Sequence, residues 1–320
     1  MNRPVLTAAY LHGIYPRSET VVSATRDLER GRATADRVDE AFRADRHALL
    51  EAQRVAGLDY LSEGLLRWQD LFRPLVESSA GLEARVLVRW FDNNSFYRAP
   101  ELVGGSLRGR LPAWVLEDGI PEPRAATLPS PYLLSRVTHG GGDPDDLMLG
   151  LARDVLAPAA ARLAQAGHRL VHLEEPWIPY AGIDAASWPA LERAVDMVRE
   201  AVTDATLVLH AYYGDAAPHA DRLRRLPVDA VGIDFVETPL DALSTPWGTG
   251  LAAGCLDGRS SVLEDPVSVA GFVRRAADRL EPTSLLVTSG SELELAGPEV
   301  APRKLAVLGE VARRLREEAR

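Results

Sequence analysis

The stretch RLVHLEEP, residues 169–176, decides the fold class of this 320-residue chain. It is a mainly apolar run that ends in two carboxylates and a proline. An amphipathic segment over 145–166 precedes it, with leucine and valine at helical spacing and Gly167 as a stop signal. Mainly apolar strands are typical of a parallel sheet that helices cover on both faces. The stretch therefore predicts one helix–strand unit of an α/β protein.

The same alternation extends over the whole chain. Nine apolar runs are strand candidates, namely Val5–Tyr10, Asp59–Leu61, Arg85–Phe91, Tyr132–Val137, Leu170–Leu173, Thr206–His210, Ala230–Phe235, Gly250–Leu256 and Leu285–Val287. Between them, helical spacing with capping residues predicts further helices, namely over 34–56, 187–202, 265–280 and 303–318.

A doubly wound sheet and a (β/α)8 barrel both fit this order of elements. Nine candidates for eight barrel positions indicate that the run near 84–97 is a hairpin or an extra piece. We predict a single (β/α)8 TIM-type barrel over residues 1–320. The segment 94–130 is rich in Gly, Pro and Arg and weakly periodic, so we predict a rim or lid insertion there.

Composition excludes several classes of protein. The single cysteine, Cys255, excludes a disulfide within the chain and any zinc site with two thiolates, and its apolar run indicates an inert core thiol. A net charge of −10 argues against nonspecific nucleic-acid binding. No apolar run is long enough for a membrane helix, and the opening residues lack a secretory signal, so we expect a cytoplasmic protein. Lys304 is the only lysine, so a fixed anion site must use arginine or backbone N–H groups.

Polar residues at strand ends are the candidate catalytic residues, because barrel sites form at the carboxyl ends of the strands. By alternation, Glu174 points inward, in phase with His172, and Glu175 points outward. We expect Glu174 to contact a substrate ammonium or a metal, or to form a structural salt bridge with an arginine. His210 ends a strand and shares a face with Tyr212, and Asp234 lies within an apolar run. For both, a catalytic or ligand role and a structural role stay open.

Other polar residues that follow apolar runs are substrate-binding candidates. His12 and Tyr15 follow the first run, without a more specific role. The substrate-binding set that we predict comprises Arg17, Ser62, Asp92, Asn93, Arg136, Glu175 and Ser291. No P-loop, dinucleotide-binding fingerprint or Ser–His–Asp order is present in the sequence.

Short motifs along nearly the whole chain resemble the cobalamin-independent methionine synthase family. They are YLHGIYPRS (10–18), AGLDYLSEG (56–64), WFDNNSFYRAPEL (90–102), LLSRVT (133–138), LVHLEEP (170–176), LPVDAVGIDFVE (226–237) and LAAGCLDGRS (251–260). The full-length family has two tandem barrels, and several of these motifs belong to its amino-terminal barrel, which lacks zinc. The resemblance implies a single barrel with amino-terminal-type motifs.

In the catalytic barrel of that family, the resemblance implies zinc held by His-x-Cys, a Glu and a final Cys. His210 matches the first ligand, whereas Tyr212, Asp234 and Ser291 stand at the other three positions. Zinc there lowers the pKa of a substrate thiol, which then attacks a methyl donor. With both thiolates missing, a zinc site through His210 and a site without metal are both open.

The resemblance therefore implies a methyl- or alkyl-transferase that acts on a small amino acid or thiol. Glu174 would hold an ammonium group, and Arg17 and Arg136 would hold carboxylates or a folate-type methyl donor. His210 and Asp234 would act as an acid/base pair or as metal ligands. Two alternatives stay open: a repurposed metal-free enzyme of the same fold, and a non-catalytic binding or partner subunit.

Overall fold

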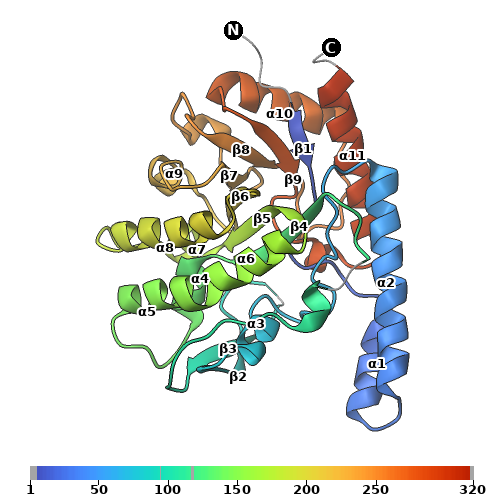
Figure 1. The fold of residues 1–320 in the computed structure, drawn as a ribbon. Coiled ribbons are helices and arrows are strands. Elements are labelled where there is room, and N and C mark those ends of the chain that lie inside the picture. Colours follow the sequence, from blue (N-terminus) through green and yellow to red (C-terminus); the bar gives the residue numbers. More distant parts are fainter. Residues whose placement is uncertain (1–5, 94, 117–118, 318–320) are drawn as a thin grey trace.

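The computed structural model describes residues 6–93, 95–116 and 119–317 (Figure 1). Its centre is a curled sheet of seven strands, all paired in parallel, in the order β1-β9-β8-β7-β6-β5-β4. The strands are β1 (Leu6–Ala9), β4 (Arg124–Pro129), β5 (His168–Glu175), β6 (Thr206–Ala211), β7 (Ala230–Asp234), β8 (Gly250–Gly254) and β9 (Leu285–Thr288). The predicted α/β class with a parallel sheet is confirmed.

A short segment connects the two edges of this sheet. Asp59 N–H donates to Ala9 O at 2.8 Å, beside β1. On the other side, Leu61 N–H donates to Pro123 O at 3.0 Å, and Ala125 N–H donates to Leu61 O at 2.9 Å. Tyr60 forms a single parallel bridge to Tyr10, and Leu61 forms one to Arg124. This predicted strand over 59–61 is therefore too short to be a full strand, but it lies where an eighth one would.

The interior and exterior of the curled sheet are packed separately. A cluster of mostly small and aliphatic side chains lies inside, comprising Ala8, Tyr10, Ala125, Leu170, Val208, Ala230, Ala252 and Leu286. The helices that cover the outside are α1 (Glu19–Glu29), α2 (Ala35–Ala56), α4 (Pro131–Val137), α5 (Pro144–Leu151), α6 (Ala157–Gln165), α7 (Trp177–Ala181), α8 (Trp188–Ala201), α9 (Ala217–Leu223), α10 (Pro266–Leu280) and α11 (Ala301–Glu317). None of the helices in the described ranges is long and apolar enough to cross a membrane.

Capping residues place most helix ends where the sequence predicts them. The Thr34 side chain accepts the N–H of Arg37 at the start of α2, and Gly57 ends that helix with a φ of 70°. The Asp265 side chain accepts the N–H of Ser268 at the start of α10. Side-chain acceptors satisfy free N–H groups at helix starts, and glycine takes the left-handed conformation without strain.

The predicted strand over 132–137 is wrong: these residues form α4. Ser130 accepts the N–H of Leu133 at 3.0 Å, and Pro131 occupies the first turn, where proline favours a helix. The strand of this unit is β4, whose six residues are all buried. Arg136 therefore lies on a helix and not at a strand end, and Thr138 directly follows that helix.

The segment 94–130, predicted as an insertion, contains several elements. It holds β3 (Tyr97–Leu102), a 3-10 turn (Ala113–Leu116) and β4; residues 94, 117 and 118 lie outside the described ranges. β3 pairs in antiparallel fashion with β2 (Leu82–Val88), so of the two alternatives for the run near 84–97, a hairpin or an extra piece, the structure has the hairpin. Figure 1 shows this hairpin and α3 (Arg73–Ser78) beyond the sheet, on the side opposite to the two chain ends, where the carboxyl ends of the parallel strands lie.

Candidate functional site

Three imidazoles and a carboxylate lie together at the carboxyl ends of the strands. His12 follows β1, His172 and Glu174 lie on β5, and His210 lies on β6. All four side chains are 0% exposed. One nitrogen from each of the three imidazoles lies within 4.8 Å of the other two. Glu174 and His210 are direct neighbours across the β5–β6 pair. We call these four residues the histidine cluster.

Outer contacts hold two members of the histidine cluster in place. His12 Nδ1 lies 2.8 Å from Glu174 Oε1, so its proton points at the carboxylate. The other ring nitrogen of His12 contacts Ser289, at 3.1 Å from its carbonyl oxygen and 3.3 Å from Oγ. His172 Nδ1 is hydrogen-bonded to the Tyr10 hydroxyl at 2.9 Å. The partner that the sequence analysis expected for a structural Glu174 was an arginine; its partner is His12.

Several polar atoms of this region have no hydrogen-bond partner within the described part of the chain. They are His172 Nε2, Glu174 Oε2, both ring nitrogens of His210, and Oε1 of Glu292, a fully enclosed side chain after β9. A buried polar atom without a partner costs about 1–3 kcal/mol, so native proteins contain few of them. Five such atoms at one end of the sheet indicate a site for a ligand that would satisfy them.

The pKa values show what kind of ligand would fit. Burial lowers the pKa of His172 to about 4 and that of His210 well below its ordinary value, so both imidazoles are neutral at pH 7. Burial alone would raise the pKa of Glu174, but His12 and His172 hold it below its ordinary value. Burial and the nearby Glu174 charge raise the pKa of Glu292. Lone pairs and carboxylate oxygens therefore converge, and a cation is the complementary ligand.

Glycines on the neighbouring strands make room for these side chains. A Cβ at Gly232 would lie 2.5 Å from His210 Cγ, and one at Gly254 would lie 3.0 Å from His210 Nε2. A Cβ at Gly290 would lie 2.3 Å from Asp234 Oδ1. Larger residues at these positions would displace His210 or Asp234.

The four residues at the zinc positions implied by the resemblance form a poor zinc site. His210 offers free nitrogens, but Tyr212 and Ser291 are buried hydroxyl residues where thiolates would be required. Asp234 Oδ1 accepts the N–H of Val236 at 3.0 Å, and burial raises the pKa of Asp234 to about 6. This set therefore does not fit a zinc ion.

The two predicted substrate-binding arginines contact residues outside the histidine cluster. Arg17 interacts electrostatically with Glu294, whereas Arg136 pairs with Asp145 at 3.4 Å and lies over the Tyr132 ring. The structure therefore does not bring the two arginines to the histidine cluster by any contact between described residues.

Two predicted residues, Glu175 and Ser62, take part in local structure. Glu175 points outward, as predicted; it accepts the Ser130 hydroxyl and the N–H of Ile178, and burial raises its pKa to about 7. The backbone of Ser62 exchanges two hydrogen bonds with the side chain of Gln53. Glu175 therefore contacts the first turns of two helices, and Ser62 belongs to a buried turn.

The WFDNN segment places aromatic side chains next to the tyrosines beside the site. The Phe91 ring lies 5.4 Å from Tyr213, which in turn packs at 4.5 Å against Tyr212. The Asn93 side chain is hydrogen-bonded to Tyr213, whereas Asp92 is exposed. Of the two predicted residues in this segment, Asn93 is therefore the one that contacts the surroundings of the cluster.

Sequence reasoning missed Glu292 and gave His12 and His172 no specific role. Glu292 belongs to a polar turn, SGSE, directly after β9, so its distance from the last apolar residue concealed it. A carboxylate at the end of a barrel strand was the available signal. Its free oxygen and the neighbouring Glu174 appear only in the folded chain.

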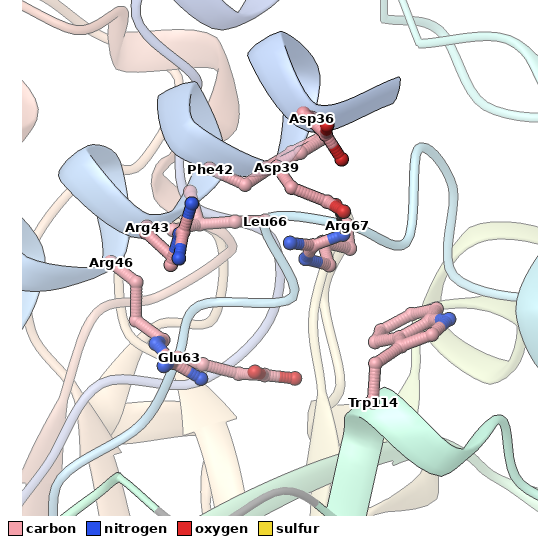
Figure 2. A pocket seen from close by; sticks show the side chains of 9 residues that line it. All are labelled: Asp36, Asp39, Phe42, Arg43, Arg46, Glu63, Leu66, Arg67 and Trp114. Atoms are coloured by element: carbon pink, nitrogen blue, oxygen red, sulfur yellow. Dashed lines mark hydrogen bonds and ion pairs between the residues drawn. The ribbon is translucent and has the colours of Figure 1, made fainter. Parts of the chain in front are cut away.

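A second hollow lies on the rim, apart from the histidine cluster. Figure 2 shows side chains of α2 on one wall of this cavity of about 540 Å³ and Trp114 on another. Its lining residues are Asp36, Asp39, Phe42, Arg43, Arg46, Glu63, Leu66, Arg67 and Trp114. Three arginines face three carboxylates, and Arg67 pairs with Asp39 at 2.7 Å, so the lining carries no excess charge that would select an anion.

Comparisons with known proteins agree with this architecture. Residues 126–281 match the family described as cobalamin-independent synthase, N-terminal domain. A methionine synthase from Sulfurisphaera tokodaii is 24% identical over 98% of this chain and 94% of its own length. A methionine synthase from Saccharolobus islandicus is also 24% identical, over 99% of this chain and 97% of its own.

Solved structures show the same fold. A B12-independent methionine synthase from Shewanella sp. W3-18-1, in complex with selenomethionine, superimposes with a TM-score of 0.73 at 15% identity and covers 98% of both chains. A putative vitamin-B12 independent methionine synthase from Listeria monocytogenes gives 0.71 at 17% identity, over 98% of this chain and 99% of that one. Because the sequence similarity extends over nearly the whole chain, this protein is a distant homologue of the cobalamin-independent methionine synthases.

Proposed function

We propose that this protein is a methyl- or alkyl-transferase whose acceptor is a small amino acid or thiol. The observation that carries the proposal is the set of buried, unpartnered atoms of His210, Glu174 and Glu292 in the described part of the chain. They lie at the carboxyl ends of the strands, where barrel enzymes bind their substrates. Distant homology to methionine synthases supports the reaction class, and the Shewanella relative was solved in complex with an amino acid, selenomethionine.

Glu292 is the residue that we assign to the substrate ammonium. One of its carboxylate oxygens has no partner in the described ranges. The carboxylate accepts a hydrogen bond from the backbone of Ile14. The Glu174 carboxylate, which the sequence analysis assigned to the ammonium, is already bonded to His12. A bound ammonium would ionise Glu292 and remove the cost of burying its free oxygen.

Asp234 and His210 are the residues that we assign to proton transfer. Burial raises the pKa of Asp234 to about 6, so the group exchanges protons near neutral pH. His210 is neutral and has both nitrogens free of protein contacts in the described structure, so in the protein without a bound metal ion it can accept a proton from a thiol. A Cβ at Gly254 would crowd His210 and one at Gly290 would crowd Asp234, so these two glycines leave room for both side chains.

The site is closed in the structure, since the histidine cluster and Glu292 are at most 2% exposed. We propose that a substrate enters past Phe91, whose ring packs at 5.4 Å against both Tyr180 and Tyr213 beside the site. The Phe91 position predicts a role in access to the site and not in the chemical step.

Ligand binding and methyl transfer test the proposal together. L-homocysteine, L-methionine and L-selenomethionine are the acceptor probes, and methyl-folates and methylcobalamin are the donor probes. We expect an acceptor to raise the melting temperature, because ligands that bind only the native state stabilise it. This shift should disappear in Glu292→Gln and persist in Glu299→Gln, which alters an exposed glutamate.

The outcomes separate the proposal from its alternatives. Transfer of a labelled methyl group to an acceptor supports the transferase. Stabilisation by an amino acid without transfer from any donor would indicate a binding subunit. A full panel of acceptors and donors that gives neither stabilisation nor transfer would overturn the proposal and favour repurposed chemistry.

A further inference from the structure

The histidine cluster contains a donor set that suits a metal ion, although it is not the set implied by the family resemblance. Neutral imidazole nitrogens and carboxylate oxygens bind divalent first-row metals such as Zn²⁺, Co²⁺ and Fe²⁺. We infer that His172, His210 and Glu174 bind one divalent transition-metal ion. The ligand atoms are Nε2 of His172, a ring nitrogen of His210 and Oε2 of Glu174, all buried and without hydrogen-bond partners among the described residues.

The geometry of the rings selects these three ligands. An imidazole binds a metal in the plane of its ring. The rings of His12 and His172 are stacked at 4.2 Å with only 15° between their planes, so one ion cannot lie in both planes. The planes of His172 and His210 are 63° apart, with centroids at 5.2 Å, so their lone pairs can converge.

The distance between two of the ligand atoms also fits. His172 Nε2 and Glu174 Oε2 are 3.6 Å apart, too far for a hydrogen bond. Two ligand atoms about 2.1 Å from a shared ion lie roughly 3.4 Å apart in a tetrahedral site. The pair therefore has the separation of two ligands that share an ion. Glu174 and His210 are in register on adjacent strands, which brings the third ligand to the same place.

The remaining contacts resemble the outer shell of a metal site. His12 bonds the second oxygen of Glu174 at 2.8 Å, and the Tyr10 hydroxyl bonds Nδ1 of His172 at 2.9 Å. Such contacts orient ligands and hold one tautomer of the histidine. His12 is therefore a positioning residue, and His172, to which the family resemblance assigns no metal role, is a ligand.

Three protein ligands leave further coordination positions open, which is typical of catalytic rather than structural sites. A bound ion would polarise or deprotonate a thiol or water that reaches it. Glu292 interacts electrostatically with Glu174, so a cation bound by Glu174 would also favour the ionised form of the Glu292 carboxyl. The inference does not depend on the proposed transferase activity, because it concerns the ion alone.

Metal binding by the full chain tests the inference without an activity assay. The protein is stripped with a chelator and titrated with Co²⁺, followed by visible absorption, and with Zn²⁺, followed by calorimetry. We expect one ion per chain and no thiolate-to-cobalt charge-transfer band. Cys255→Ser should leave the spectrum unchanged, because that thiol lies against Thr288 O and outside the donor set.

Variants then identify the ligands. His172→Gln and His210→Gln should each weaken Co²⁺ binding by about 100-fold or more, and His12→Gln by about 10- to 100-fold. His47→Gln alters an exposed histidine of α2 and should have no effect. Circular dichroism establishes that each variant is folded. X-ray absorption of the zinc-loaded wild type, which needs no variant, should show nitrogen and oxygen neighbours only, with two imidazoles.

Three results would overturn the inference: no stoichiometric ion in the wild type, binding that survives in both His172→Gln and His210→Gln, or sulfur in the zinc shell. Loss of binding in His12→Gln together with full binding in Glu174→Gln would refute this choice of ligands. Failure of metal binding is distinguishable from failure of the proposed function, because amino-acid stabilisation through Glu292 is measured on metal-free protein.

Discussion

Lys304, the only lysine in the chain, is completely buried and should be a major determinant of stability. Its Nζ donates to Glu264 Oε1 at 2.8 Å, to Glu264 Oε2 at 3.1 Å and to Val262 O at 2.8 Å. These bonds tie α11 to the segment that follows β8. The same Glu264 carboxylate accepts the N–H of Asp257, so the ion pair organises that segment.

The expected cost of Lys304→Met follows from burial. Removal of one partner from a buried ion pair costs about 3–5 kcal/mol. The Glu264 side chain is 20% exposed, so water relieves part of that cost and we expect about 3 kcal/mol. At an unfolding entropy of about 2 cal/mol/K per residue, this corresponds to a fall of roughly 4–5 °C in melting temperature.

Urea unfolding followed by circular dichroism measures this change. The midpoint should fall in Lys304→Met without a change in slope, which would indicate a loss of stability only. The double variant Lys304→Met/Glu264→Gln should recover part of the loss, because no unpaired charge is left. Arg303→Met, at an exposed neighbouring position, should change stability by less than about 0.5 kcal/mol. If Lys304→Met costs no more than Arg303→Met, the ion pair does not stabilise the fold.

The remaining predictions concern the site and its surroundings. Gly232→Ala should destabilise the protein by about 1–3 kcal/mol, because its methyl group would displace His210. Gly271→Ala on α10, where a Cβ would meet only the end of the Arg275 side chain at 3.7 Å, should be neutral or stabilising, and thermal unfolding of the two variants in parallel measures the difference. Asp234→Asn should gain stability relative to wild type as pH rises from 4 to 7, by about 2 kcal/mol, since the raised pKa of Asp234, about 6, makes its ionisation costly in the folded state; equal pH profiles would contradict this. Burial raises the pKa of Cys255 to about 12, so a thiol reagent should label it only in denaturant, and rapid labelling of native protein would refute that burial.

Local sequence determined the elements whose signals lie within a few residues. The Thr34 cap and the Gly57 stop define α2, and Asp265 defines the start of α10, because capping bonds involve groups three residues apart or fewer. The alternation of a strand likewise determined that Glu174 shares the inner face with His172 while Glu175 faces outward. His210, Asp234 and Tyr212 were identifiable as strand-end residues for the same reason.

Tertiary structure decided the questions that depend on contacts between distant residues. The apolar run over 132–137 is compatible with a strand or with a buried helix. In the structure β4 is the strand of this unit, and the run forms the helix that follows it. His12 and Glu292 follow the neighbouring strands β1 and β9, whereas His172 lies on β5, which is four strands away from β9, so His172 meets the other two only because the sheet curls. The packed structure likewise determines which buried polar atoms have a hydrogen-bond partner. The sequence shows which side chains can bind a ligand, but only the fold brings them together.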